Sequence, residues 1–150
     1  MTLAQKTLEI ATAQIGVEEM PRNSNAGPEV EIYLKSVGLG KGYAWCMAFI
    51  YWCTHRASLH LNEKNPLKKT GGVLDQFNSR PLLVKKAPQP GDVFIMDFNN
   101  GTGHAGFVEK IAGSTVYTIE GNTNDSGGRE GYKVARRKRD IKSFKGFLRI

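Results

Sequence analysis

The fold is decided by the stretch AWCMAFIYWCTHRA, residues 44–57, whose first ten side chains are all apolar. A helix that is apolar on all sides is normally buried, whereas a surface helix keeps one polar face. Gly38, Gly40 and Gly42 separate this stretch from the segment before it. We therefore predict that residues 44–57 form the central, buried helix of the domain.

Two further helices are predicted before the central one. Thr2 opens a capping box, which indicates a helix that ends near Gly16. Pro28 suits the first position of a helix and Gly38 is a typical stop, so a second helix is predicted between them. A short helix is predicted near residues 72–78.

The apolar pattern changes to that of strands after residue 89. Strands are predicted at residues 93–98, 105–111, 115–119, 132–137 and 144–150. Short turns join most of them, and the polar run at residues 121–131 is predicted to be a connection. Such spacing predicts an antiparallel meander of about five strands. Helices followed by strands indicate a single α+β domain over residues 1–150, with the central helix packed on the sheet.

The positive charge is concentrated at the C-terminal end. The chain has 21 basic and 14 acidic residues, and residues 129–150 hold nine of the basic and two of the acidic ones, so the net charge of +7 belongs to that segment. A basic segment favours an anionic partner. We interpret it as an electrostatic anchor to an anionic envelope to which Arg137 and Arg139 contribute. Strand alternation separates neighbouring basic side chains, so no specific nucleic acid is predicted.

Composition excludes several classes of protein. The chain is 40% apolar and long enough to bury a core without disulfides or metal. No run reaches the about 18–20 consecutive apolar residues of a membrane-spanning helix, so membrane insertion is not predicted. Residues 1–19 contain no continuous apolar core of a signal peptide, which predicts synthesis in the cytoplasm without classical export.

The two cysteines are predicted to be free thiols. Cys46 and Cys53 are seven residues apart, which places their Cα atoms about 10.5 Å apart on a helix, beyond the roughly 7 Å limit for a disulfide. Their spacing, with His55 nearby, matches no common zinc pattern, so no metal or other cofactor is predicted. Either thiol is available as a nucleophile, and Cys53 is interpreted as a core residue.

Three residues predict nucleophilic chemistry. Cys46 lies at the start of the central helix, where unpaired N–H groups and the helix dipole stabilise a thiolate. His104 begins a predicted strand beside Gly103 and Gly106, which leave room for a thiol and a substrate. Glu120 ends the next strand, so a hairpin would bring imidazole and carboxylate together. The set provides a nucleophile, a base and an orienting group.

Four segments follow one another in a recognisable order: YAWCMAF at 43–49, PGDV at 90–93, GHAGFV at 103–108 and IEGN at 119–122. Together they resemble the CHAP domain family, the cysteine, histidine-dependent amidohydrolases/peptidases, which are related to the NlpC/P60 cell-wall peptidases. The resemblance runs from about residue 8 to the C-terminus and implies a papain-like fold. It also implies that Cys46 is the nucleophile, His104 the general base and then acid, and Glu120 the group that orients it. Asn122 matches a polar position that supports the site, and Tyr43 and Trp45 are predicted to contact substrate.

The resemblance implies hydrolysis of amide bonds in bacterial peptidoglycan through a thioester on Cys46. The bond is either that between sugar and peptide or one within the peptides. A monomer that acts in the periplasm or cell wall is expected, either a phage lysin or an interbacterial toxin with an immunity protein as partner. Some phage members of the family have an aspartate-rich calcium loop before the nucleophile. The segment NSNAG at 23–27 has no aspartate, so a calcium requirement is not expected here. The alternative function is that of a non-catalytic module that binds cell wall or nucleic acid through the basic C-terminal strands. Among enzymes, a transferase that forms the same thioester and passes it to an amine is a second alternative.

Overall fold

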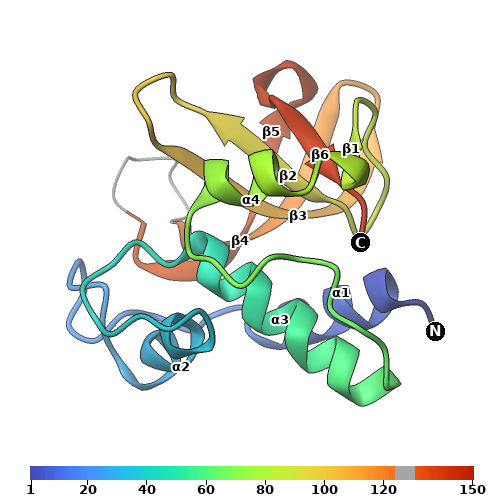
Figure 1. The fold of residues 1–150 in the computed structure, drawn as a ribbon. Helices are drawn as coiled ribbons and strands as arrows, with labels where there is room; N and C mark the ends of the chain where they lie inside the picture. Colours follow the sequence, from blue (N-terminus) through green and yellow to red (C-terminus); the bar gives the residue numbers. More distant parts are fainter. Residues whose placement is uncertain (124–130) are drawn as a thin grey trace.

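The computed structural model describes residues 1–123 and 131–150 and shows helices packed on one antiparallel sheet (Figure 1). The helices are α1 Leu3–Ala13, α2 Pro28–Ser36, α3 Cys46–Leu61 and α4 Val73–Ser79, with short 3₁₀ turns at Pro81–Leu83 and Ile141–Ser143. The strands are β1 Val84–Lys85, β2 Val93–Asp97, β3 Gly103–Ala112, β4 Thr115–Thr123, β5 Lys133–Asp140 and β6 Gly146–Leu148. The predicted α+β class is confirmed, and the arrangement is compatible with a papain-like fold.

The predicted helix signals are present. The Thr2 hydroxyl accepts a hydrogen bond from the Gln5 N–H at 3.1 Å, and the Gln5 side chain accepts one from the Thr2 N–H at 2.8 Å, which completes the capping box of α1. Pro28 is the first residue of α2, and Gly38 follows the helix with a φ of 82°. No helix in the described part of the chain is long and apolar enough to cross a membrane.

The sheet has the order β1-β6-β2-β3-β4-β5, and all its pairs are antiparallel. The predicted meander holds from β2 to β5, but it is wrong for β6, which pairs with β2 (Phe94 opposite Phe147) instead of β5. All three residues of β6 are buried between β1 and β2, and an edge position beside β5 would expose one side of that strand. The predicted connection at 121–131 is shorter, because β4 extends to Thr123, and residues 124–130 lie outside the described residues.

The surroundings of the central helix α3 account for its apolar sequence. One side of α3 packs against β3 and β4, and α1 and α2 pack against the rest of it (Figure 1). Ten of its 16 side chains are buried, and the first six, at residues 46–51, are buried without a break. A second apolar cluster, around Phe94 and Val108, lies on the other face of the sheet, because successive residues of a strand point to opposite faces. The prediction of a central buried helix is confirmed, but α3 begins at Cys46 and ends at Leu61 instead of running from residue 44 to 57.

Candidate active site

Cys46 is the first residue of α3, so its position depends on what fixes the start of that helix. Trp45 precedes it, and the indole Nε1 donates a hydrogen bond to Glu19 Oε2 at 2.8 Å. The indole is fully buried and contacts the backbone at Gly121, where a Cβ atom would lie 2.9 Å from the Trp45 ring. The predicted contact of Trp45 with substrate is therefore wrong: this side chain anchors the helix start beneath the site.

The Cys46 thiol is 5% exposed and lines a cavity. Burial opposes ionisation of this thiol. Hydrogen bonding to His104, the charge of His104 and the backbone groups of Ala105 and Met47 outweigh burial, so the pKa of Cys46 lies below its ordinary value. Cys53 is also a free thiol, but burial without such partners raises its pKa well above the ordinary value. The structure therefore distinguishes an activated cysteine from a core cysteine.

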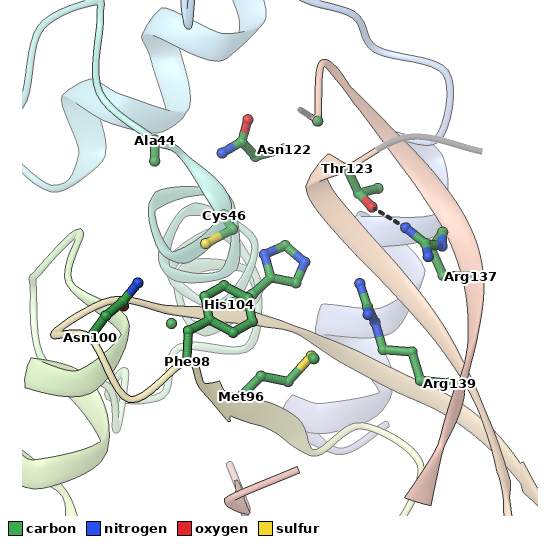
Figure 2. Close-up of a pocket in the computed structure, with 12 residues that line it drawn as sticks. Ala44, Cys46, Met96, Phe98, Asn100, His104, Asn122, Thr123, Arg137 and Arg139 are labelled. Carbon is green, nitrogen blue, oxygen red and sulfur yellow. Dashed lines mark hydrogen bonds between the residues drawn. The ribbon is translucent and has the colours of Figure 1, made fainter. Parts of the chain in front are cut away.

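His104 lies on β3 next to Cys46 (Figure 2), and its ring also contacts Glu120. Its Nε2 is 2.8 Å from Glu120 Oε1, which leaves Nδ1 as the ring nitrogen available to the thiol. Burial by itself lowers the pKa of His104, but hydrogen bonds to Cys46 and Glu120 and the charges of both outweigh it and raise the pKa to about 9. Both shifts favour a thiolate on Cys46 paired with an imidazolium on His104.

Glu120 is fully buried and every lone-pair direction of its carboxylate is used. Arg139 donates from Nε to Oε2 and from Nη2 to Oε1, both at 2.7 Å, and the Thr118 hydroxyl donates to Oε2 at 2.6 Å. Burial raises the pKa of a carboxyl group, but Arg139 and His104 outweigh it and hold the pKa of Glu120 well below its usual range. The carboxylate is therefore ionised and fixed, as an orienting group for His104 must be.

The expectation for Arg139 needs correction. Its side chain is only 17% exposed and is bound to Glu120, so it is not part of an electrostatic anchor on the surface. The β5 side chains alternate as expected: Arg137 and Arg139 face the cavity, whereas Arg136 and Lys138 are exposed. Strand alternation was visible in the sequence, but the partner of Arg139 was not.

Gly106 provides space for the carboxylate rather than for substrate. A Cβ atom at this position would lie 2.8 Å from Glu120 Cγ and 2.5 Å from the Phe94 ring. Gly103 likewise faces the backbone oxygen of Met96, at 2.4 Å from an added Cβ. The space beside Gly106 is thus taken up by Glu120 and Phe94, whereas Gly103 lines the cavity, where room for a substrate stays a prediction.

The remaining predicted residues differ in their relation to the cavity. Asn122 lines it close to Cys46, with a left-handed φ of 55°, at a register shift between β4 and β5 (Figure 2). Tyr43 is 56% exposed and is not among the residues that line the cavity, so its contact with substrate stays a prediction. In the described residues, no group of three or more His, Cys, Asp or Glu side chains is placed to hold a metal ion.

The comparisons with known proteins agree with this geometry. The CHAP domain family model matches residues 38–122, the segment that carries Cys46, His104, Glu120 and Asn122. A solved structure described as "The crystal structure of Ly7917" is similar with a TM-score of 0.57 and 15% identity, over 99% of this chain and 62% of that one. The present chain thus spans less than two thirds of that chain, and the likeness concerns the fold alone. No curated protein matches the sequence. Because the family model covers more than half of the residues, the chain belongs to the CHAP domain family.

Proposed function

We propose that the protein is a thiol amidohydrolase or peptidase that cleaves amide bonds of bacterial peptidoglycan with Cys46 as its nucleophile. Membership in the CHAP family indicates a hydrolase of the amidase or peptidase type. The observation that carries the proposal is the continuous set of contacts from Cys46 through His104 and Glu120 to Arg139. Such a set activates a thiol and fixes its base.

In the first step, the Cys46 thiolate attacks the amide carbonyl carbon, and the C=O electrons move onto oxygen. The N–H groups at the start of α3 have no acceptor within the helix, so the Cys46 N–H is suited to stabilise that charge. When the oxyanion collapses, the C–N bond breaks, and the His104 imidazolium gives its Nδ1 proton to the departing amine. A thioester on Cys46 and neutral His104 remain.

In the second step, water attacks the thioester and His104 accepts its proton. The C–S bond breaks, the carboxylic acid product leaves, and the thiolate–imidazolium pair is restored. Asn122 lines the same cavity as Cys46 and is proposed to hold the substrate or the imidazole in place. The net reaction consumes one amide and one water and needs no cofactor.

Digestion of purified sacculi tests this function. Wild-type protein is expected to release soluble muropeptides with new free amines, each product pair heavier than its parent by one water, and the product masses identify the cleaved bond. The matched control is the same protein after alkylation with iodoacetamide, which should release none. Amine release that equals the alkylated control would contradict the proposal, and products joined to an added amine would indicate a transferase instead.

A peptidoglycan hydrolase must reach the periplasm or cell wall. We propose that the protein acts there as a monomer, either as a phage lysin or as an injected toxin for which an immunity protein covers the cavity. The alternative of nucleic-acid binding is disfavoured, because two arginines of the basic segment, Arg137 and Arg139, face the catalytic cavity and are not part of an outer surface patch.

A further inference from the structure

The catalytic cavity has a volume of about 680 Å³ and is lined by both apolar and basic side chains (Figure 2). Met96 and Phe98, from β2 and the turn after it, form an apolar side. Arg137 and Arg139 come from β5 at another side. The cavity therefore offers different chemistry to different parts of a bound peptide.

Most charges that the described residues bring to the cavity have a partner. Arg139 is paired with Glu120, and the pKa shifts of Cys46 and His104 favour a thiolate and an imidazolium that offset each other. In residues 1–123 and 131–150, no carboxylate side chain lines the cavity. Among the cavity side chains that the structure describes, Arg137 is thus the cation without a compensating carboxylate.

The geometry of Arg137 leaves its guanidinium available to a ligand. Arg137 is on β5, opposite Thr118 of β4, and its side chain is on the same face of the sheet as that of Arg139. Its Nη1 donates a hydrogen bond to Thr123 Oγ1 at 3.1 Å. Within the described ranges, no carboxylate lies within 4.0 Å of it, whereas the neighbouring Arg136 is paired with Glu109. The Thr123 hydroxyl accepts this bond through its oxygen and carries one proton of its own, which is the group that we assign to a bound anion.

We propose that Arg137 and Thr123 form a subsite that binds a free carboxylate of the substrate peptide, so that the enzyme selects acidic stem peptides over amidated ones. The inference rests on the proposed function and names the substrate class of that same site. A guanidinium presents a planar fork of donors that matches a carboxylate in a bidentate arrangement. An amidated carboxyl has no charge and offers one acceptor oxygen, so it leaves part of the fork unpaired.

The experiment compares N-acetylmuramoyl-L-Ala-γ-D-Glu-L-Lys-D-Ala with two counterparts, one amidated at the α-carboxyl of D-Glu and one at the terminal carboxyl. Wild type is expected to show a ratio of kcat/KM for acid over amide of about tenfold or more in one of the pairs, the size of a hydrogen bond between charged groups. Arg137→Gln should lower kcat/KM for the acidic substrate and leave that for the amide unchanged, so that the ratio falls to near one. Arg137→Lys should keep part of the preference.

The matched control is Lys138→Gln, which removes the same charge from the next residue of β5, where the side chain is exposed. It should keep the wild-type ratio, which separates a local subsite from a general effect of net charge. Circular dichroism and thermal unfolding verify that each variant is folded. A wild-type ratio near one in both pairs, or a ratio that Arg137→Gln leaves unchanged, would overturn the subsite.

Binding to the Cys46→Ala protein separates the subsite from the proposed reaction. Calorimetric titration with the same peptides should show tighter binding of the acid, and the additional substitution Arg137→Gln should abolish the difference. Selective binding without turnover by wild type would contradict the hydrolase and retain the subsite. Turnover combined with equal affinity for acid and amide in both pairs would retain the hydrolase and overturn the subsite.

Discussion

Replacement of His104 by glutamine is expected to lower kcat by about 10³-fold, the size typical of removing a positioned general acid and base. Glutamine can still hydrogen-bond Glu120, but it provides neither a proton for the leaving amine nor a positive charge beside Cys46. The measurement is the initial rate on a soluble muropeptide. The matched control is His60→Gln, an exposed position in the last turn of α3, which should stay within about twofold of wild type.

The pH dependence identifies what His104 does. Because the pKa of Cys46 lies below the ordinary thiol value and that of His104 is raised to about 9, kcat/KM should rise on the acid side as the thiolate forms. It should fall near pH 9 as the imidazolium loses its proton. At mildly acidic pH, iodoacetamide should label Cys46 and leave Cys53 unmodified.

In His104→Gln the alkylation of Cys46 should require a higher pH than in wild type. Burial still opposes the thiolate, and the hydrogen bond and charge that offset burial are gone. An unchanged alkylation profile would show that His104 does not activate the thiol. Equal labelling of Cys53 in wild type would contradict the assignment of Cys46 as the activated cysteine.

Glu120 and Arg139 form a buried ion pair whose two members should be tested together. Glu120→Gln leaves the Arg139 charge without a partner and is expected to lower the free energy of unfolding by about 3 kcal/mol, and Arg139→Met should cost a similar amount. The double variant with both Glu120→Gln and Arg139→Met should recover most of this stability, because neither charge of the pair remains. Its kcat should stay low, since His104 has lost its carboxylate.

Urea unfolding and initial rates of the four proteins measure this cycle. The matched control is Arg136→Met, whose pair with Glu109 is solvent-exposed and contributes at most about 1 kcal/mol. Losses of stability that simply add in the double variant, or recovery of its activity, would contradict the proposed role of the pair.

Acidification should remove the stabilisation that the Glu120–Arg139 ion pair provides. The pKa of Glu120 is held well below its usual range, so the stabilisation is present above the ordinary carboxyl pKa and is lost as the pH falls. Wild type should therefore lose more unfolding free energy on acidification than the double variant.

The features that the sequence predicted correctly depend on local patterns. The apolar run at 44–53 predicts a buried helix, and antiparallel pairing of two adjacent strands brings His104 and Glu120 together. Both follow from periodicity and short loops. Glu120 is nevertheless not the end of its strand, because β4 continues to Thr123.

The features that could not be predicted from the sequence depend on contacts between distant segments. Arg139 belongs to a basic run that resembles a solvated surface, and only the register of β5 against β4 places it on Glu120. Trp45 is next to the nucleophile, but its direction is set by Glu19, 26 residues earlier. The pairing of β6 with β2 likewise results from burial of Phe147 and Leu148, which no local pattern encodes.

In the proposed reaction, the Cys46 thiolate takes the acyl group of a peptidoglycan amide. The most direct test is acid quenching of wild type during turnover of a muropeptide, followed by intact and peptide mass spectrometry, with Cys46→Ala and Cys53→Ala alongside. We expect an acyl adduct on the peptide that contains Cys46 in wild type and in Cys53→Ala, and neither adduct nor turnover in Cys46→Ala. Turnover that persists in Cys46→Ala, or an acyl group found on Cys53, would contradict the account.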